Sequence, residues 1–296
     1  MLQSFSIQFK QSIATAHPAS SSSFKSSSSS SFQIKMKFLT LASTLVLASS
    51  AVAAPNTAKR WAAHEKRVAN SRTAGHPLQR VTGPTPDATN DTFVEYSSNW
   101  AGAILIGSGY TEVTATFTVP TPSTAGSGAA WVGIDGDTCD TAILQTGIDW
   151  TKSGSSVTYD AWYEWYPDYS YDFSGITLAA GNTIKVTVKA SSLTGGTATV
   201  ENVSTGKTVT HTFSNEGSEG SLCETNAEWI VEDYEEGSSL VKFADFGTVT
   251  FTGCSAIESG TTVGTTGATI IDIEQNGKVL TDCSVPSSSE VTCSYV

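Results

Sequence analysis

A seven-residue stretch, Thr183-Ile-Lys-Val-Thr-Val-Lys189, alternates polar and apolar side chains with a period of two, which is the pattern of a half-buried β-strand. The stretch Thr208-Val-Thr-His-Thr-Phe213 repeats this pattern. Further strand candidates, none with a sustained helical period, lie at Val113–Val119, Ala129–Ile134, Thr197–Val203, Val241–Phe246, Val249–Phe251 and Thr269–Gln275. Many short strands between Gly- and Ser/Thr-rich turns, with no alternating helices, predict one all-β domain built as a two-sheet sandwich.

Another stretch, Tyr159-Asp-Ala-Trp-Tyr-Glu-Trp-Tyr-Pro167, interleaves acidic and aromatic residues. In a strand, successive side chains point to opposite faces. One face would carry Asp160, Trp162, Glu164 and Tyr166, and the other Ala161, Tyr163 and Trp165. Carboxylates between large aromatic rings are typical of the floor of a binding cleft, although a purely structural aromatic cluster has the same composition.

Two β-type runs contain polar residues where apolar ones are expected. The run Ala142-Ile-Leu-Gln-Thr-Gly-Ile-Asp-Trp150 contains Gln145, and the run Ala227-Glu-Trp-Ile-Val-Glu-Asp-Tyr234 contains Glu228 and Glu232 on one face. Polar groups inside such runs are costly unless they are hydrogen-bonded or used in function. An amide that holds an oxyanion and a carboxylate that activates water would suffice for hydrolysis without histidine.

Charge is distributed very unevenly along the 296 residues. Residues 1–91 hold ten lysines and arginines and three acidic residues, whereas residues 92–296 hold six lysines, no arginine and 25 acidic residues. A domain this acidic is not expected to bind nucleic acid, because that affinity depends on Lys and Arg contacts to phosphate. Repulsion among the carboxylates would be relieved by protonation, so we expect a protein that works in acid.

The N-terminal third of the chain has the composition of targeting and processing segments. Residues 36–53 combine a basic start, a short apolar stretch and an Ala-x-Ala end, which predicts a secretory signal peptide and an extracellular protein without a membrane anchor. The preceding Ser-rich residues 1–35 are interpreted as a low-complexity extension, with translation expected to start at Met36. Residues 54–91 are basic and predict a propeptide that docks on the acidic domain at neutral pH and inhibits it; residues 92–296 are the expected catalytic domain.

Five cysteines in a secreted chain predict disulfides and one free thiol. Cys283 and Cys293 flank a turn-rich stretch that suits a hairpin staple; Cys139 would then pair with Cys223 and leave Cys254 free, but the spacings alone do not fix this pairing. The sequons at Asn90 and Asn202 are candidate glycosylation sites.

Several hydrolytic chemistries lack their residues in this chain. His211 is the single histidine of residues 92–296 and has no acidic neighbour, so a Ser-His-Asp or Cys-His site is not expected. The cysteine and histidine spacings match no zinc site, and no metal or other cofactor is expected. A pair of Asp-Thr-Gly motifs is also absent. Carboxylate chemistry remains, with either two carboxylates or a carboxylate and a neutral partner.

Several long motifs in register resemble the glutamic peptidases, or eqolisins. They are Ser98–Gly107, Ala130–Cys139, Ile143–Gly147, Tyr159–Pro167, Asp172–Gly175 and Asn226–Tyr234. The resemblance implies a concanavalin-like jelly roll of two seven-stranded antiparallel sheets, a monomer, and polypeptide substrates. It also implies that Gln145 and Glu232 are the catalytic pair, and that Cys139–Cys223 and Cys283–Cys293 are the disulfides.

The resemblance also implies a set of substrate-binding positions around the catalytic pair. These are Trp131, Asp135, Asp160, Trp162, Glu164 and Tyr166. One departure from the family is that the stretch after Glu235 and Glu236 lacks a cysteine-closed loop that some relatives have.

In the expected mechanism, ionised Glu232 activates a water and the Gln145 amide donates to the developing oxyanion. Two other functions fit the same aromatic and acidic strand face. One is an acid glycoside hydrolase on a jelly-roll sandwich that uses paired carboxylates such as Glu164 and Glu232. The other is a carbohydrate-binding module without catalysis. Gln145 discriminates among them, because a glycosidase does not require it.

Overall fold

The computed structural model describes residues 75–82, 94–237 and 239–296, which all belong to one compact unit. The expected signal peptide, the Ser-rich extension, most of the expected propeptide and the sequon at Asn90 lie outside the described residues. Among the described residues, no helix is long and apolar enough to cross a membrane.

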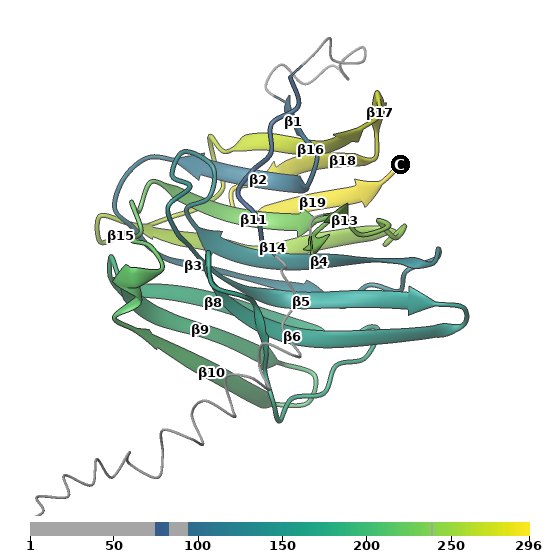
Figure 1. Ribbon diagram of the computed structural model, residues 1–296, viewed down its shortest axis with the longest axis horizontal. Helices are drawn as coiled ribbons and strands as arrows, with labels where there is room; N and C mark the ends of the chain where they lie inside the picture. The colour runs from purple at the N-terminus through teal and green to yellow at the C-terminus, as the bar shows by residue number, and fades with distance from the viewer. Residues whose placement is uncertain (1–74, 83–93, 238) are drawn as a thin grey trace, which may run out of the picture. The chain divides into compact units, whose positions relative to one another are not determined.

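Two large sheets account for almost all of the regular structure (Figure 1). The first sheet contains, in spatial order, β1 (Val94–Ser97), β16 (Thr269–Gln275), β2 (Trp100–Ile106), β11 (Asn226–Glu232), β4 (Gly126–Ile134), β5 (Ile143–Ser153), β6 (Ser156–Tyr166) and β7 (Tyr171–Asp172), with β17 (Lys278–Val279) paired to β16. The second contains β10 (Lys207–Ser214), β9 (Gly195–Asn202), β8 (Thr183–Ser192), β3 (Tyr110–Thr118), β14 (Thr248–Glu258), β19 (Glu290–Tyr295) and β18 (Thr281–Ser287), with β15 (Thr261–Val263) paired to β14. The remaining elements are the β12 (Glu235–Glu236) and β13 (Ser239–Leu240) pair and the short 3₁₀ helix η1 (Glu216–Ser218).

The all-β, two-sheet architecture is confirmed, but the strand count differs from seven in each sheet. The first sheet has nine strands and the second eight, because the short strands β7, β15 and β17 pair at the sheet margins. All pairings are antiparallel except β1 with β16, which run parallel. The predicted strand at 269–275 has the bounds of β16, and the two alternating stretches form β8 and β10.

One predicted strand is wrong. Residues 241–246 form a loop in which Phe243 makes only an isolated bridge to Ser127. The side chains of Phe243, Ala244 and Phe246 are buried in the main core. The apolar pattern that predicted a strand therefore reflects the burial of a loop rather than sheet pairing.

Buried apolar residues form two clusters, one on each face of the first sheet. The larger cluster fills the space between the sheets and includes Trp229 and Val231 of β11. The indole N–H of Trp229 also donates to the Thr114 carbonyl of β3 at 3.0 Å, which links the two sheets. The smaller cluster includes Ile230 and Trp131 and lies on the opposite face, which we call the outer face.

Both disulfides implied by the family resemblance are present. Cys139 bonds to Cys223 across 84 residues of sequence, and Cys283 bonds to Cys293 between the paired strands β18 and β19. Cys254 is a buried free thiol.

The sequon at Asn202 is not available for a glycan in this fold. Asn202 is fully buried, and its Nδ2 atom donates to the Thr177 carbonyl at 2.9 Å and to Asn182 Oδ1 at 2.8 Å. A sugar on Nδ2 would remove a donor and leave no room for this packing. Burial therefore argues against Asn202 as a glycosylation site in the folded protein.

Two buried aspartates couple folding to pH. Asp272 Oδ1 accepts from Thr281 Oγ1 and from the Cys283 amide, both at 2.9 Å. Asp233 Oδ2 accepts from Gln275 Nε2 at 2.7 Å. Burial raises the pKa of Asp233 and of Asp272 to about 7, and these hydrogen bonds oppose the rise. The folded protein therefore binds protons more tightly at both sites than the unfolded chain does.

The free energy of unfolding is expected to fall as the pH rises from about 4, where unfolded aspartates titrate, to about 7. The loss arises because the unfolded chain ionises these carboxyl groups first and is thereby favoured. Urea denaturation at a series of pH values measures this change in the free energy of unfolding. The Asp272→Asn variant should show a shallower pH dependence, whereas Glu219→Gln, at an exposed position, should match the wild type. An unchanged slope in Asp272→Asn would contradict the assignment.

Candidate active site

Cross-strand register brings the polar residues of the outer face into rows. One row runs from Glu228 across Gly133 to Gln145 and Glu164, on the adjacent strands β11, β4, β5 and β6. A second row contains Glu232, with Trp100 on β2 and Ala129 on β4 as its direct neighbours. Because strand side chains alternate, these rows confirm that the predicted polar and aromatic residues share one face.

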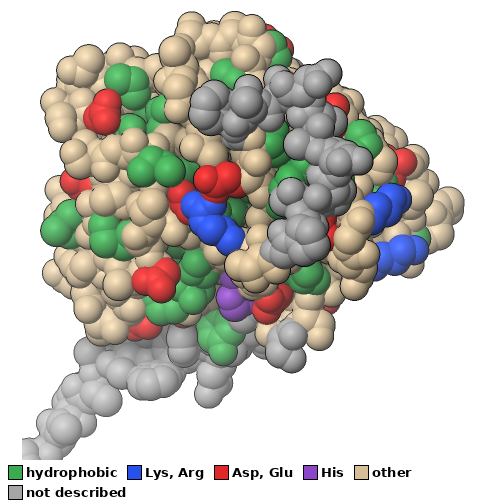
Figure 2. Space-filling view, turned by 90° about the horizontal axis from the view of Figure 1, so that it is seen from above, with side chains coloured by type: hydrophobic (Ala, Val, Ile, Leu, Met, Phe, Trp, Pro, Cys, Tyr) green, Lys and Arg blue, Asp and Glu red, His purple; other side chains and the backbone are tan. Residues whose placement is uncertain are grey.

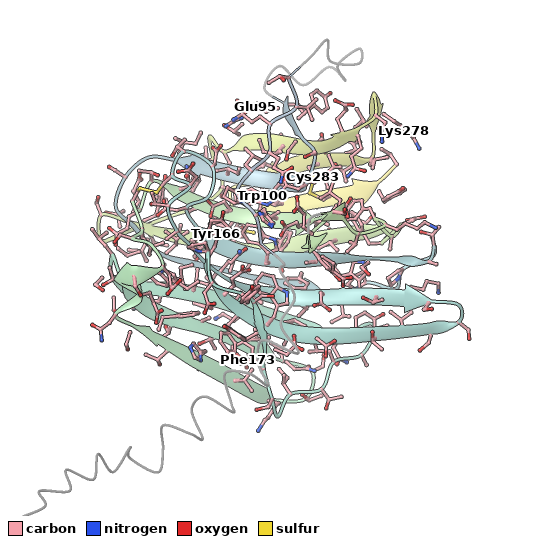
Figure 3. The ribbon with its side chains drawn as sticks, in the orientation of Figure 1. Glu95, Trp100, Tyr166, Phe173, Lys278 and Cys283 are labelled. Atoms are coloured by element: carbon pink, nitrogen blue, oxygen red, sulfur yellow. A yellow bond between two sulfur atoms is a disulfide. The ribbon has the colours of Figure 1, made fainter. Side chains whose placement is uncertain are left out.

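Glu232 is buried and held by two tryptophans. Its Oε1 accepts from Trp100 Nε1 at 3.2 Å, and its Oε2 accepts from Trp131 Nε1 at 2.8 Å. The two indole rings pack edge to face with centroids 4.9 Å apart, and Figure 3 labels Trp100. Gly147 lies opposite Trp131, and a β-carbon there would come within 2.5 Å of Trp131 Cβ, so the strand accommodates this ring only next to glycine.

The pKa of Glu232 reflects opposing influences. Burial raises it well above the usual value, while the hydrogen bonds from Trp131, Trp100 and the His76 backbone lower it. Indole N–H groups donate only, so Trp100 and Trp131 fix the orientation of the carboxylate and favour its ionised form.

Gln145 and Glu164 form a directly opposed pair on β5 and β6. Gln145 Nε2 donates to Glu164 Oε2 at 3.0 Å, and both side chains are almost fully buried. Gln145 Oε1 makes no hydrogen bond to any described residue. Burial, and then the nearby charge of Glu232, raise the pKa of Glu164 well above its usual value.

Residues 75–82, which we call the covering segment, lie on this site. The backbone of Gly75 hydrogen-bonds to Glu164, and the backbone of His76 hydrogen-bonds to Glu232. Adjacent α-carbons are about 3.8 Å apart, so one dipeptide spans both carboxylates. A β-carbon on Gly75 would overlap the Gln145 amide nitrogen, and therefore only glycine fits at this point.

Further contacts fix the rest of the covering segment. The Leu78 amide donates to the Gly136 carbonyl at 2.9 Å, and Leu78 packs against the apolar cluster of the outer face. Asn99 Nδ2 donates to the carbonyls of His76 and Pro77, both at 3.3 Å.

Two side chains of the covering segment, Arg80 and His76, lie beside acidic side chains of the domain. Arg80 pairs with Glu95 and, at 2.5 Å, with Asp137. His76 Nε2 lies 3.4 Å from Glu235 Oε2. Burial raises the pKa of Asp137, while the Arg80 guanidinium lowers it.

The structure places the other predicted site residues in different surroundings. Trp162 belongs to the outer-face cluster, Tyr166 packs against it and lies beside the His76 ring, and Asp160 is paired opposite Asp149. Asp135 differs most from the prediction, because its carboxylate accepts the backbone amides of residues 223–226 at 2.7 to 3.2 Å. Its oxygens thus hold the loop that carries Cys223 rather than the covering segment.

Glu228, which shares a strand face with Glu232, has a different environment. It is fully buried, and neither carboxyl oxygen is hydrogen-bonded to a described residue. Burial, followed by the charges of Asp135 and Asp137, raises its pKa well above the usual value. Burial raises the pKa of both glutamates, but only Glu232 has indole donors that favour its ionised form, which favours Glu232 as the base.

Asn99 and Trp100 contact the site but were not among the predicted site residues. Asn99 Oδ1 also accepts the Gln79 amide at 3.0 Å, so this side chain binds the covering segment through both of its polar atoms. The Ser98-Asn-Trp100 motif contained this signal. It was not recognised because sequence alone does not bring β2 next to β11.

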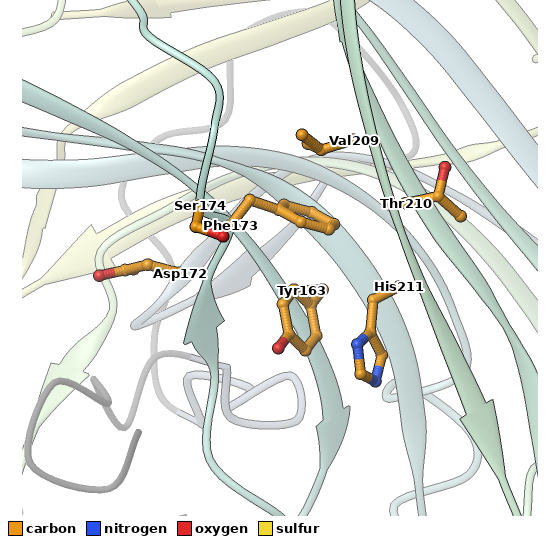
Figure 4. A pocket seen from close by; sticks show the side chains of 7 residues that line it. All are labelled: Tyr163, Asp172, Phe173, Ser174, Val209, Thr210 and His211. Atoms are coloured by element: carbon orange, nitrogen blue, oxygen red, sulfur yellow. The ribbon is translucent and has the colours of Figure 1, made fainter. Parts of the chain in front are cut away.

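His211 lies on the opposite side of the first sheet from Gln145 and Glu232. Its ring stacks on Tyr163 with centroids 4.0 Å apart, on the core side of β6. Both rings line a cavity of about 270 Å³ together with Asp172, Phe173, Ser174, Val209 and Thr210. Figure 4 shows these side chains. This cavity is lined by neither Gln145 nor Glu232, so His211 lies apart from the candidate catalytic residues.

Comparison with known proteins gave consistent matches. The model of the Peptidase A4 family matches residues 98–295. Aspergillopepsin-2 from Aspergillus niger is 53% identical over 286 residues, covering 88% of this chain and 100% of that protein. Scytalidopepsin B from Scytalidium lignicola is 49% identical over 275 residues, with the same coverage.

Solved structures are similar as well. Scytalido-glutamic peptidase with a transition state analog inhibitor has a TM-score of 0.64 and 53% identity, covering 67% of this chain and 98% of that chain. Aspergilloglutamic peptidase from Aspergillus niger has a TM-score of 0.56 and 63% identity, covering 57% and 99%.

The Gly75→Val variant is expected to displace the covering segment, because the added side chain overlaps Gln145 and Glu164. Hydrogen exchange at neutral pH measures this displacement. The amides of Leu78 and Val81, which donate to Gly136 and Tyr96, should lose protection. Amides of β8 on the other sheet serve as the control and should keep theirs. Retained protection at Leu78 would show that the segment tolerates a side chain at residue 75.

Proposed function

The chain belongs to the Peptidase A4, or eqolisin, family of peptidases, and we propose that it is a secreted acid endopeptidase whose catalytic pair is Gln145 and Glu232. The observation that carries the proposal is the covering segment. A peptide backbone lies across this site, with the consecutive residues Gly75 and His76 hydrogen-bonded to Glu164 and Glu232 beside the Gln145 amide.

Hydrolysis follows from these groups. Ionised Glu232 removes a proton from a water that attacks the carbonyl carbon of the scissile bond. The Gln145 NH₂ group donates to the oxygen on which negative charge develops. Protonated Glu232 then returns the proton to the departing amine, so the C–N bond breaks and a carboxylic acid and an amine result.

Operation in acid requires Glu232 to be ionised at low pH. Burial is the main cause of its raised pKa in the covered state, and the Trp100 and Trp131 hydrogen bonds oppose it. When the covering segment leaves, water reaches the carboxylate while both indole donors remain. Departure also removes the His76 hydrogen bond, which lowers the pKa, but burial is the larger influence. We therefore expect the pKa of Glu232 to fall and a base to become available in acid.

The covering segment supports a second part of the proposal, that the basic propeptide 54–91 is an intramolecular inhibitor of a zymogen. The segment occupies the site by backbone contacts and is held by Arg80 on Asp137 and Glu95 and by His76 beside Glu235. Acidic side chains are scattered over the face in Figure 2, with basic ones at few positions. Burial raises the pKa of Asp137, so acid protonates this carboxyl group, removes its ion pair with Arg80 and thereby favours release of the segment. We propose that the released enzyme is a monomer that acts on polypeptides outside the cell.

Replacement of either member of the catalytic pair is expected to abolish most activity with the fold retained. Loss of one oxyanion donor costs roughly 10²–10³ in rate, so Gln145→Ala should fall by about that factor. Glu232→Gln should fall at least as far, because it removes the base. Casein hydrolysis at about pH 3 with pepstatin present measures both, with Glu219→Gln as the control.

Soluble polysaccharide as a parallel substrate separates peptidase from glycosidase. Wild-type protein that releases sugar and leaves casein intact would contradict the proposal and favour the paired-carboxylate alternative. A folded Glu232→Gln variant with near wild-type proteolysis would overturn the choice of base.

A synthetic peptide of residues 54–91, added to acid-activated protein, is expected to inhibit at about pH 7 and not at about pH 3, because protonation of Asp137, whose pKa burial raises, removes its ion pair with Arg80. Inhibition constants at the two pH values measure the effect. A peptide with Arg80→Gln should inhibit less at neutral pH. Equal inhibition by the original peptide at both pH values would exclude electrostatic control.

A further inference from the structure

The amide of Gln145 has a single hydrogen-bonding side-chain neighbour among the described residues. Glu164, directly opposite on β6, accepts from Nε2 at 3.0 Å. On the other side the neighbour is Gly133, which has no side chain to offer. Gln145 Oε1 has no described partner. The orientation of this amide is therefore determined from the Glu164 side.

Orientation matters because the two ends of a glutamine amide have nearly the same shape and opposite hydrogen-bonding character. With NH₂ toward the substrate, the amide stabilises an oxyanion. Rotated by half a turn, it presents a carbonyl oxygen that repels the same oxyanion. An acceptor on the Glu164 side selects the first orientation, since it binds one N–H and leaves the second N–H for the reacting oxygen.

We propose that Glu164 is a positioning residue that holds the Gln145 amide with its NH₂ group toward the scissile carbonyl. This inference rests on the proposed function and adds a residue to it. A protonated glutamic acid has one O–H donor and a carbonyl oxygen that accepts, so Glu164 serves this role in acid when its carbonyl oxygen faces Gln145 Nε2. The groups that face Glu164 are Glu232, Asp168, Tyr166, the Gln145 amide and the Gly75 backbone.

Burial and neighbouring side chains restrict the position of the Glu164 side chain. It is 2% exposed and sits on the same strand as Trp162 and Tyr166, which fix its position on the outer face. Asp168, whose charge also acts on Glu164, is engaged with the Tyr171 hydroxyl and the Tyr169 amide. Glu164 thus remains the side chain that holds the amide.

A double-mutant cycle on the full chain, activated in acid, tests the inference. The variants are Gln145→Ala, Glu164→Leu and the two combined, with Glu201→Leu on the other sheet as the control. Glu164→Leu should lower kcat by about 10- to 100-fold with little change in KM, because the contact acts on the transition state. Added to Gln145→Ala, it should cause almost no further loss, since the residue it positions is gone.

Two further readouts separate positioning from a structural role. Glu164→Gln keeps an acceptor oxygen and should retain activity within about fivefold of the wild type. The affinity for a peptide-based transition-state analogue should fall in Glu164→Leu by the same factor as kcat/KM. If Glu164→Leu does not fold, Glu164→Asp, which withdraws the oxygen by one methylene, enters the same cycle.

The outcomes distinguish this inference from the proposed function. Full additivity of Glu164→Leu and Gln145→Ala, or a change confined to KM, overturns the positioning role and leaves the catalytic pair intact. Near wild-type activity of folded Gln145→Ala overturns the proposed function itself, and the positioning role with it.

Discussion

The cross-strand register of β11, β4, β5 and β6 is the constraint on which the site depends. It places Glu232 beside Trp100, and Gln145 opposite Glu164, with glycines at Gly133 and Gly147 where large neighbours need room. A slip of one residue in any of these strands would turn its polar side chains into the core between the sheets. The apolar core thus fixes the geometry of the site, because it permits only one register.

Burial of carboxyl groups is the main energetic difficulty of this arrangement, and the protein meets it in different ways. Glu232 receives two indole donors, whereas Asp135 receives the amides of a loop. Glu228 receives no hydrogen bond from the part of the chain that the structure describes. These carboxyl groups therefore differ in how strongly their ionised forms are stabilised, although most of them lie on one face of the first sheet. Several of these groups are most favourably buried when protonated, and we therefore expect the folded state to tolerate acid.

Much of the fold and the site could be predicted from local pattern. Period-two alternation gave the faces of β6 and β11 correctly. The polar residues singled out in apolar runs, Gln145 and Glu232, are buried on the outer face, and their catalytic role stays a prediction. The limits came from packing. Residues 241–246 have an apolar pattern because, as a loop, they bury side chains in the core between the sheets. Asn202 satisfies the sequon pattern but is buried. Asp135 belongs to a motif of the site yet turns toward residues 223–226, a contact across about ninety residues of sequence.

By itself, the sequence determined the all-β class, the acidic domain, the side-chain alternation and, through motif resemblance, the family. These properties depend on residue type and short spacing, which a linear chain displays directly. Only the tertiary structure decided which carboxyl group each donor reaches, that Asn99 and Trp100 belong to the site, and that residues 75–82 cover it. Those contacts join strands and segments far apart in the chain, and their partners are set by sheet order and register, which local pattern does not encode.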